Sequence, residues 1–160
     1  MRNDLTTEQL QQPINVSLPL GALLGLTASP QPGAPVHTSA SAHALPAIGS
    51  AYGTIGIFAG LTIDDCDPYE LVLLPGEFNG NWKDAAAWAK EQGGVLPSRV
   101  DALILWQNLP NEFKKEAYWT DTQHAADSDY AWYQYFNYGY QNSINISHKL
   151  RARSVRRLAI

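Results

Sequence analysis

The sequence predicts an α+β fold in which strands and helices occupy separate stretches of the chain. Two strand-like runs come first, two stretches with helical caps and helical spacing follow, and several strand-like runs complete the chain. This order differs from the strand–helix alternation of a nucleotide-binding sheet. With 160 residues, of which 45% are apolar, the chain is long enough for one domain with a hydrophobic core.

Residues 1–50 differ in composition from the rest of the chain. They hold six of the ten prolines and few charges, so they can form neither long helices nor a core of their own. Two interpretations remain open: a disordered leader, and an arm that docks onto a larger assembly or a sister subunit. The run at 18–26 favours the arm because exposure of so apolar a segment to water is unfavourable. Apolar and polar residues also alternate at 14–18, as in a short strand. We therefore predict an extended N-terminal arm, followed by a folded domain at residues 51–160.

Two strands open this domain. Tyr52 to Phe58 and Tyr69 to Leu74 have the apolar and aromatic character of strands, and Pro75-Gly76 ends the second one.

The segment between these strands is acidic and carries the only cysteine of the chain. Asp64, Asp65 and Asp67 could offer oxygens to calcium, but we interpret them as a solvated acidic turn. Cys66 has no partner for a disulfide, and a thiolate zinc site would need several cysteines. The neighbouring carboxylates are expected to raise the pKa of its thiol, which argues against a catalytic nucleophile.

Two helices follow, each with a capping signal at its start. Asn81 caps the first helix, with an acidic residue three positions on, and Gly93-Gly94 ends it. Ser98 with Asp101 repeats the arrangement for the second helix, which ends near Pro110. The residues expected to face the core are Trp82, Ala85, Ala86 and Ala89 in the first helix and Val100, Leu103 and Ile104 in the second.

Three more strand-like runs complete the domain, at Ala117 to Thr120, Tyr130 to Tyr138 and Leu150 to Leu158. Beyond Gly139 the chain is expected to be polar and loop-like. The last run is basic, and its cations are Lys149, Arg151, Arg153, Arg156 and Arg157. Because apolar residues lie between these cations, we interpret the run as a structural strand with pairing arginines rather than a phosphate-binding patch.

The chain lacks the motifs of several enzyme and cofactor-binding classes. Neither the P-loop pattern nor the dinucleotide fingerprint occurs, and no serine lies in a nucleophile-elbow context. The four histidines are far apart, and each is interpreted as a surface or loop residue: His37, His43, His124 and His148. The net charge of −4 gives no basic face for nucleic acid or an anionic membrane. We predict no metal site, no cofactor and no nucleic-acid partner.

The first residues lack the basic start and apolar run of a signal peptide. The most apolar stretch is about half the length needed to span a bilayer. We expect a soluble chain that is made in the cytosol and is not inserted into a membrane.

The most informative stretch is aromatic and amide-rich, with five tyrosines within residues 130–140. In a strand, alternation sends Trp132, Gln134 and Phe136 to one face, and it sends Tyr133, Tyr135 and Asn137 to the other. Tyrosine brings a large rigid contact area, while Asn and Ser supply adaptable hydrogen bonds, as in antibody paratopes. We therefore predict a recognition surface here; the alternative is an ordinary two-sided strand and its loop.

A series of short motifs resembles the C-type-lectin-like family found in bacterial adhesins and phage tail proteins. The motifs are Trp82 with Ala85-Ala86, then residues 93–99 (GGVLPSR), 118–122 (YWTDT) and 151–157 (RARSVRR). The resemblance covers about residues 52–159. It implies a compact fold with two helices packed on small antiparallel sheets, which holds a variable patch on a rigid scaffold.

Residues 131–157 resemble, more specifically, the variable region of proteins diversified by retroelements, such as phage tropism determinants. In that group an adenine-rich template dominated by AAC codons is copied with errors at adenines, which yields Tyr, Ser, Ile and His as well as Asp and Thr in place of Asn. Positions 135, 137, 138, 140 and 142–148 hold only Tyr, Asn, Ser, Ile and His. The intervening residues resemble an unvaried scaffold: Trp132, Gln134, Phe136, Gly139 and Gln141. With Tyr133 from the strand alternation, the predicted ligand-binding residues are Tyr133, Tyr135, Asn137, Tyr138, Tyr140, Asn142, Ser143, Ile144, Asn145, Ile146, Ser147 and His148.

The resemblance implies a phage or prophage tail-associated receptor-binding protein of the virion, as in a tail fibre, and often a homotrimer. Its expected partners are a host cell-surface protein or glycan and, through the N-terminal arm, other tail proteins. The calcium-dependent sugar motifs of true C-type lectins are absent, since Pro110-Asn111-Glu112 has the wrong order. The cysteine pair of the sulfatase-activating enzymes with this fold is absent too, so we predict no enzymatic activity. A virion decoration protein and a bacterial surface adhesin are the alternatives.

Overall fold

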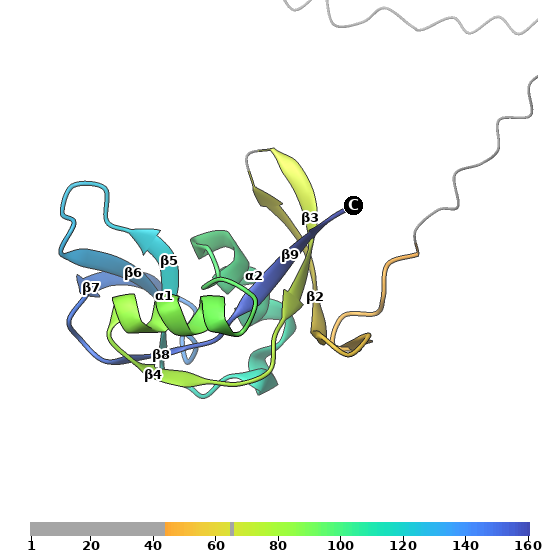
Figure 1. Ribbon diagram of the computed structural model, residues 1–160, viewed down its shortest axis with the longest axis horizontal. Helices are drawn as coiled ribbons and strands as arrows, with labels where there is room; N and C mark the ends of the chain where they lie inside the picture. The colour runs from red at the N-terminus through yellow and green to blue at the C-terminus, as the bar shows by residue number, and fades with distance from the viewer. Residues whose placement is uncertain (1–43, 65) are drawn as a thin grey trace, which may run out of the picture. The chain divides into compact units, whose positions relative to one another are not determined.

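The computed structural model describes residues 44–64 and 66–160 (Figure 1). The strand expected at 14–18, most of the predicted arm, His37, His43 and Asp65 lie outside the described residues. In chain order the elements are β1 (Ala51–Tyr52), β2 (Gly56–Asp64), β3 (Asp67–Leu73), β4 (Phe78–Gly80), α1 (Trp82–Glu91), α2 (Arg99–Asn108), the 3-10 helix η2 (Pro110–Glu112), β5 (Ala117–Gln123), β6 (Tyr130–Tyr135), β7 (Gln141–Asn145), β8 (Leu150–Ala152) and β9 (Val155–Ala159).

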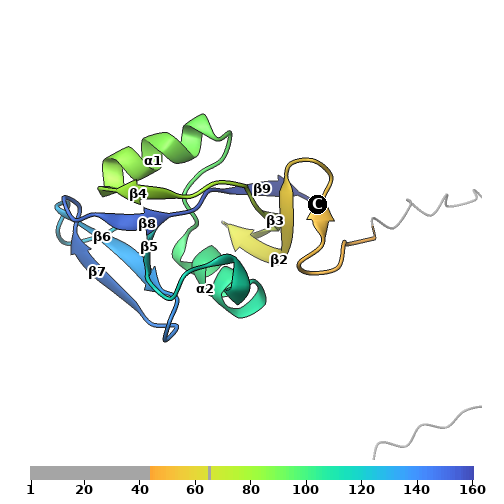
Figure 2. The same cartoon turned by 90° about the horizontal axis from the view of Figure 1, so that it is seen from below.

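The predicted α+β class is confirmed for this part of the chain, in which two α-helices pack with two sheets. One sheet is antiparallel and has the strand order β1-β2-β3-β9. The other is mixed and has the order β4-β8-β5-β6-β7, in which β5 and β8 are parallel. β8 and β9 belong to different sheets, so the last part of the chain connects the two sheets, as Figure 2 shows.

The two helices cover opposite faces of the mixed sheet (Figure 2). On β5, Tyr118 and Trp119 are neighbours and therefore point to opposite faces. Tyr118 joins the cluster that α2 buries against the antiparallel sheet, together with Leu71, Leu73 and Leu105 among others. Trp119 joins the cluster beneath α1, whose other members are Ala85, Ala89, Leu96, Ala131 and Ala152. The mixed sheet is thus buried on both faces at its centre.

The first helix forms as predicted. The Asn81 side chain caps α1 by accepting a hydrogen bond from the Asp84 backbone N–H at 3.0 Å. Ala85 and Ala89 are fully buried, and Trp82 and Ala86 pack against the same cluster. The helix ends before Gly93, whose φ of +78° suits glycine.

The start of the second helix was predicted correctly, but its buried face was not. Ser98 and Asp101 form a capping box at the start of α2. The expected apolar stripe is wrong for Val100 and Leu103, which are 51% and 43% exposed, whereas Ile104 is half-buried and packs against the core as expected. The buried residues of α2 are instead Asp101, Ala102 and Leu105. A carboxylate therefore takes the place in the interior where the spacing predicted aliphatic side chains.

This buried carboxylate is fully bonded. Asp101 accepts hydrogen bonds from the Ser98 backbone N–H at 2.9 Å and from the Thr62 hydroxyl at 2.6 Å. Arg157 donates two more, from Nε at 2.9 Å and Nη2 at 2.5 Å. A buried charge needs such an ion pair and such hydrogen bonds. Arg151 likewise contacts Glu77 at 2.9 Å and Glu116 at 2.8 Å. The ion pairs of Arg151 and Arg157 confirm the interpretation of the basic run as a structural segment with pairing arginines.

Several strand boundaries differ from those predicted. The first predicted strand is two strands joined by a turn, and the last is divided at Arg153-Ser154, where the chain passes between the sheets. The strand from Tyr130 ends at Tyr135 rather than 138, because a turn begins there. In the stretch beyond Gly139, residues 141–145 form a strand, β7, and not the expected loop, whereas residues 146–148 form a turn. An edge strand tolerates polar residues, which is why its composition resembled a loop.

The folded region also begins earlier than residue 51. Gly49 donates its backbone N–H to the carbonyl of Phe58 at 2.8 Å, and Ser50 accepts one from Phe58 at 2.9 Å. These two residues therefore extend the pairing of β1 with β2.

Candidate binding surface

The predicted ligand-binding residues lie on β6, β7, the turn between them and the turn after β7. Among the described strands, β7 pairs with β6 only, which makes it an edge of the mixed sheet. Figures 1 and 2 show this edge on the side away from the antiparallel sheet. We call the β6–β7 pair with its two turns, residues 130–148, the open edge.

The open edge carries a group of tyrosines that we call the tyrosine cluster: Tyr133, Tyr135, Tyr138 and Tyr140. The ring of Tyr135 lies 5.6 Å from that of Tyr138 and 5.3 Å from that of Tyr140, measured between centroids. The rings of Tyr138 and Tyr140 are stacked at 6.5 Å, with an interplanar angle of 9°. Tyr138 is 71% exposed and Tyr140 is 49% exposed, so the outer part of the cluster faces solvent.

The inner part of the cluster touches the core. Tyr133 packs against the buried group beneath α1. Burial raises the pKa of the Tyr133 phenol, and its hydrogen bond with Tyr140 and the nearby phenols raise it further. The cluster thus extends from the interior to the surface, so its exposed rings rest on a fixed base.

The turn that presents Tyr138 and Tyr140 is held on both sides. Gly139 has a φ of +78°, and a Cβ there would lie 2.5 Å from the Trp106 ring of α2. Before the turn, the Phe136 ring stacks on Phe113 with centroids 3.9 Å apart. Two backbone hydrogen bonds close the turn, from the Gly139 N–H to the Tyr135 carbonyl and from the Tyr135 N–H to the Tyr140 carbonyl, each at 2.9 Å. These contacts give the exposed rings a defined position.

The other face of the open edge is attached to the start of α2. The Arg99 guanidinium lies 3.7 Å above the Trp132 ring. Arg99 also donates from Nε to the Gln141 side-chain oxygen at 2.9 Å, and Gln141 Nε2 donates to the Arg99 carbonyl at 2.7 Å. Sequence reasoning missed this role of Arg99, because it depends on a contact between residues 42 positions apart.

The predicted residues do not form one flat patch. Cross-strand partners share a face, so Asn142 and Ile144 lie with Tyr133 and Ala131 on the α1 side. Ser143 and Asn145 lie on the α2 side, opposite Trp132 and Tyr130. The residues therefore surround the edge instead of covering a single face.

Exposure divides the predicted set further. The exposed members are Tyr138, Tyr140, Asn142, Ser147 and His148, and the half-buried ones are Tyr133, Tyr135, Asn137, Ser143, Ile144, Asn145 and Ile146. Ile144 and Ile146 pack against the buried group under α1. Asn145 accepts hydrogen bonds from Ser147, at 3.0 Å from its N–H and 2.7 Å from its hydroxyl, which closes the second turn.

One exposed tyrosine was left out of the predicted set. Tyr130 is 38% exposed and lines a shallow hollow of about 220 Å³ with His124, Asp127 and Ser143. Its place at the start of the aromatic stretch was the signal that could have included it. His124, in the loop before β6, and exposed His148 match their interpretation as loop or surface residues.

No protein-family model matches the chain, and no curated protein matches it. Within residues 44–64 and 66–160, no helix is long and apolar enough to cross a membrane. In the same ranges, no group of three or more His, Cys, Asp or Glu side chains is arranged to hold a metal ion.

Proposed function

We propose that the chain is a tail-associated receptor-binding protein of a phage or prophage, with a C-type-lectin-like fold and a diversified contact surface at the open edge. It acts by binding and not by catalysis. Its partners are a host cell-surface protein or glycan at the open edge and other tail proteins at the N-terminal arm, in a homotrimer.

The observation that carries this proposal concerns the five residues that interrupt the Tyr, Asn, Ser, Ile and His pattern. Each is either buried or in contact with α2. Gln134 and Phe136 are buried, and Gly139 lies against Trp106. Trp132 and Gln141 both contact Arg99. The residues that interrupt the pattern thus belong to the scaffold, and every exposed side chain of residues 131–148 belongs to the pattern, as expected for a surface whose side chains are meant to change.

The fold supports the same proposal. Two helices pack on two small sheets, and the aromatic stretch occupies the last two strands of one sheet. The hydrogen bonds between β6 and β7 come from the backbone, so they do not depend on which side chains the strands carry. A backbone held in this way tolerates changes at Asn142 or Tyr140 without losing its register.

The chemistry of the exposed side chains suits recognition. Tyr138 and Tyr140 offer ring faces and hydroxyl groups, while Asn142, Ser147 and His148 offer hydrogen bonds. Tyrosines at the centre of an interface are frequent hot spots. Protein and glycan surfaces both accept aromatic stacking combined with polar contacts, so the site chemistry is compatible with either receptor.

The decisive test replaces Tyr138 and Tyr140 together by alanine in the intact particle. We expect adsorption to host cells to fall at least tenfold, because two exposed aromatic contacts are lost while the scaffold contacts remain. Replacement of the exposed Lys83 and Glu91 of α1 by alanine is the matched control and leaves adsorption unchanged. Circular dichroism of the purified proteins checks that all variants are folded. Unchanged adsorption of the tyrosine variant refutes the proposal, and a defect in particle assembly alone favours a decoration protein.

The proposed diversification has its own test in the gene. We expect codons ending in C, of the form NNC, at positions 135, 137, 138, 140 and 142–148. We also expect a nearby reverse transcriptase gene and a near-copy of the region that encodes the C-terminal part. A gene without NNC codons at these positions would remove the retroelement from the proposal and leave the binding surface to be judged by adsorption.

A further inference from the structure

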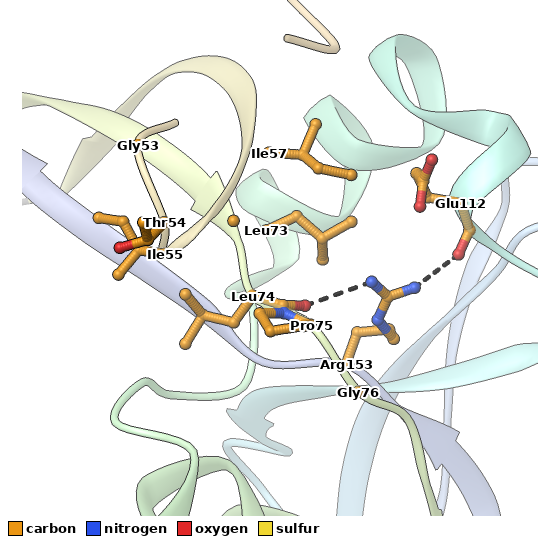
Figure 3. Close-up of a pocket in the computed structure, with 11 residues that line it drawn as sticks. Gly53, Thr54, Ile55, Ile57, Leu73, Leu74, Pro75, Gly76, Glu112 and Arg153 are labelled. Atoms are coloured by element: carbon orange, nitrogen blue, oxygen red, sulfur yellow. Dashed lines mark hydrogen bonds between the residues drawn. The ribbon is translucent and has the colours of Figure 1, made fainter. Parts of the chain in front are cut away.

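A cavity of about 440 Å³ lies away from the open edge, between the β1–β2 turn, the end of β3 and η2. Its walls include Ile55, Ile57, Leu73 and Leu74, and its polar side chains include Arg153 and Glu112. Figure 3 shows the Arg153 guanidinium between the Leu74 and Glu112 carbonyl oxygens. The volume is within the usual range of small-ligand sites.

The guanidinium of Arg153 is held in a fixed position. Its Nη1 donates to the Glu112 carbonyl at 2.6 Å, and its Nη2 donates to the Leu74 carbonyl at 3.3 Å. The Phe113 ring lies beneath it, with 5.3 Å between the guanidinium carbon and the ring centroid. These contacts orient the group, but carbonyls and an aromatic face carry only partial charges and do not neutralise it.

Arg153 differs in this respect from its neighbours along the chain. Arg151 contacts the carboxylates of Glu77 and Glu116, and Arg157 contacts that of Asp101. Within the described ranges, no carboxylate oxygen lies within 4.0 Å of a nitrogen of Arg153, and its buried Nε has no hydrogen-bond partner. Burial lowers the pKa of Arg153 below its usual value, although the group stays charged near neutral pH. Arg153 is half-buried, and the Glu112 carboxylate acts on its charge only from beyond 4.0 Å, so the guanidinium has no carboxylate in direct contact.

The remaining N–H groups of Arg153 specify what such a partner would be. A guanidinium has five N–H donors in a planar fork, and two of them are used by the carbonyls. A carboxylate matches this fork and supplies the missing negative charge. The aliphatic walls at Ile55, Ile57 and Leu73 add a preference for a compact apolar group attached to it.

We propose that this cavity is a binding site for a carboxylate attached to a small apolar group. The carboxylate accepts hydrogen bonds from Nη1 and Nη2 of Arg153, and the apolar group lies against Ile57 and Leu73. Such a ligand can be a free aliphatic acid or the C-terminal residue of a peptide. The site shares no residue with the open edge, so it is independent of host recognition.

The binding test uses isothermal titration calorimetry of the full chain with matched probes. The free acid is 4-methylpentanoate, with 4-methylpentanol as its uncharged control. The peptide is Gly-Gly-Leu, with its C-terminal amide as control. We expect a carboxylate probe to bind with a Kd of about 1 mM or tighter, which corresponds to an ordinary binding free energy for a ligand of this size. Binding of the free acid alone identifies a small-molecule site, and tighter binding of the peptide identifies a chain terminus. Failure of both, or equal binding of the uncharged controls, overturns the proposal.

Variants of the cavity give opposite expected changes. Arg153→Met loses at least tenfold in carboxylate affinity, because the charge and the fork are removed while the alkyl stem is kept. Glu112→Gln gains about threefold, because a negative side chain that lines the cavity is neutralised. Arg156→Met is the matched control, since its guanidinium bonds the Gly93 carbonyl elsewhere, and its affinity is unchanged.

A further variant covers the case in which Arg153→Met does not fold. Ile55→Glu, in the β1–β2 turn, introduces a carboxylate at the cavity wall, so it repels the probe and offers Arg153 a partner within the protein. We expect binding to be lost in this variant. Unchanged affinity in both Ile55→Glu and Glu112→Gln contradicts the assignment, whatever the stability of Arg153→Met.

Discussion

The open edge and the buried Asp101 site use polar side chains in opposite ways. At the Asp101 site, Thr62, Ser98 and Arg157 converge on one carboxylate that is fully buried. At the open edge, Tyr138 and Tyr140 contact mainly other tyrosine rings and are largely exposed. A substitution at the Asp101 site leaves a buried charge without a partner, whereas a substitution at the open edge removes side-chain area that is exposed to solvent.

The difference indicates how one stretch of chain can hold the fold and still vary. Gln141 and Asn142 are neighbours on β7, but one bonds Arg99 and the other is exposed. Strand alternation assigns adjacent residues to different environments, so fixed and variable positions can be interleaved. The stability of the domain should therefore depend on the fixed positions, and binding on the exposed ones.

The largest effect on stability is expected at Asp101. Asp101→Ala leaves the Arg157 guanidinium without its main partner and removes the capping box of α2. We expect a loss of about 3–5 kcal/mol in the free energy of unfolding, measured by urea denaturation. Glu91→Ala, an exposed position at the end of α1, is the control and changes it by less than about 0.5 kcal/mol. A loss at Asp101 no larger than that of the control would show that the network does not stabilise the fold.

A smaller effect is expected at the turn of the open edge. Gly139 and Gly53 both have positive φ angles, of +78° and +55°, but only Gly139 has a ring where a Cβ would lie. Alanine at either position strains the backbone by about 1 kcal/mol, and at Gly139 it also displaces Trp106. Thermal unfolding should show Gly139→Ala to be less stable than Gly53→Ala by about 1–2 kcal/mol. Equal losses would mean that the turn does not need its close contact with α2.

A gain in stability is expected at Gln134. This side chain is fully buried on β6, and among the described residues neither its oxygen nor its nitrogen has a hydrogen-bond partner. Gln134→Met keeps the shape and removes the buried polar atoms, so it should stabilise the domain by about 1 kcal/mol. Gln107→Met, on the exposed face of α2, is the control and should have almost no effect. A loss of stability at Gln134 would indicate that its amide is hydrogen-bonded in solution.

Local signals in the sequence were sufficient for the caps and the fold class. Asn81 and Ser98 each cap a helix together with a residue three positions later, so a few consecutive residues are enough to predict their role. The buried face of α2 was not, because Asp101 is drawn inward by Arg157, 56 residues later in the chain. The spacing of Val100, Leu103 and Ile104 favoured a face of which only Ile104 packs against the core, and this long-range ion pair accounts for the difference.

The candidate site was predictable in composition but not in shape. Residue types pointed to the stretch around Tyr133 to His148, yet β7 was mistaken for a loop because an edge strand can be polar. The distribution of the residues over both sides of the edge depends on the β6–β7 register, in which Tyr133 pairs with Asn142. The contact of Arg99 with Trp132 and Gln141 depends on how α2 packs, which no local pattern encodes.

The most direct test of the account is a library that randomises five exposed positions of the open edge to Tyr, Asn, Ser, Ile or His. The positions are Tyr138, Tyr140, Asn142, Ser147 and His148. Because their side chains are exposed, most members should keep their free energy of unfolding within about 0.5 kcal/mol of the parent. Most particles that carry them should lose adsorption to the original host. The opposite result, with many unfolded members or with adsorption retained throughout the library, would contradict a variable surface carried on an independent scaffold.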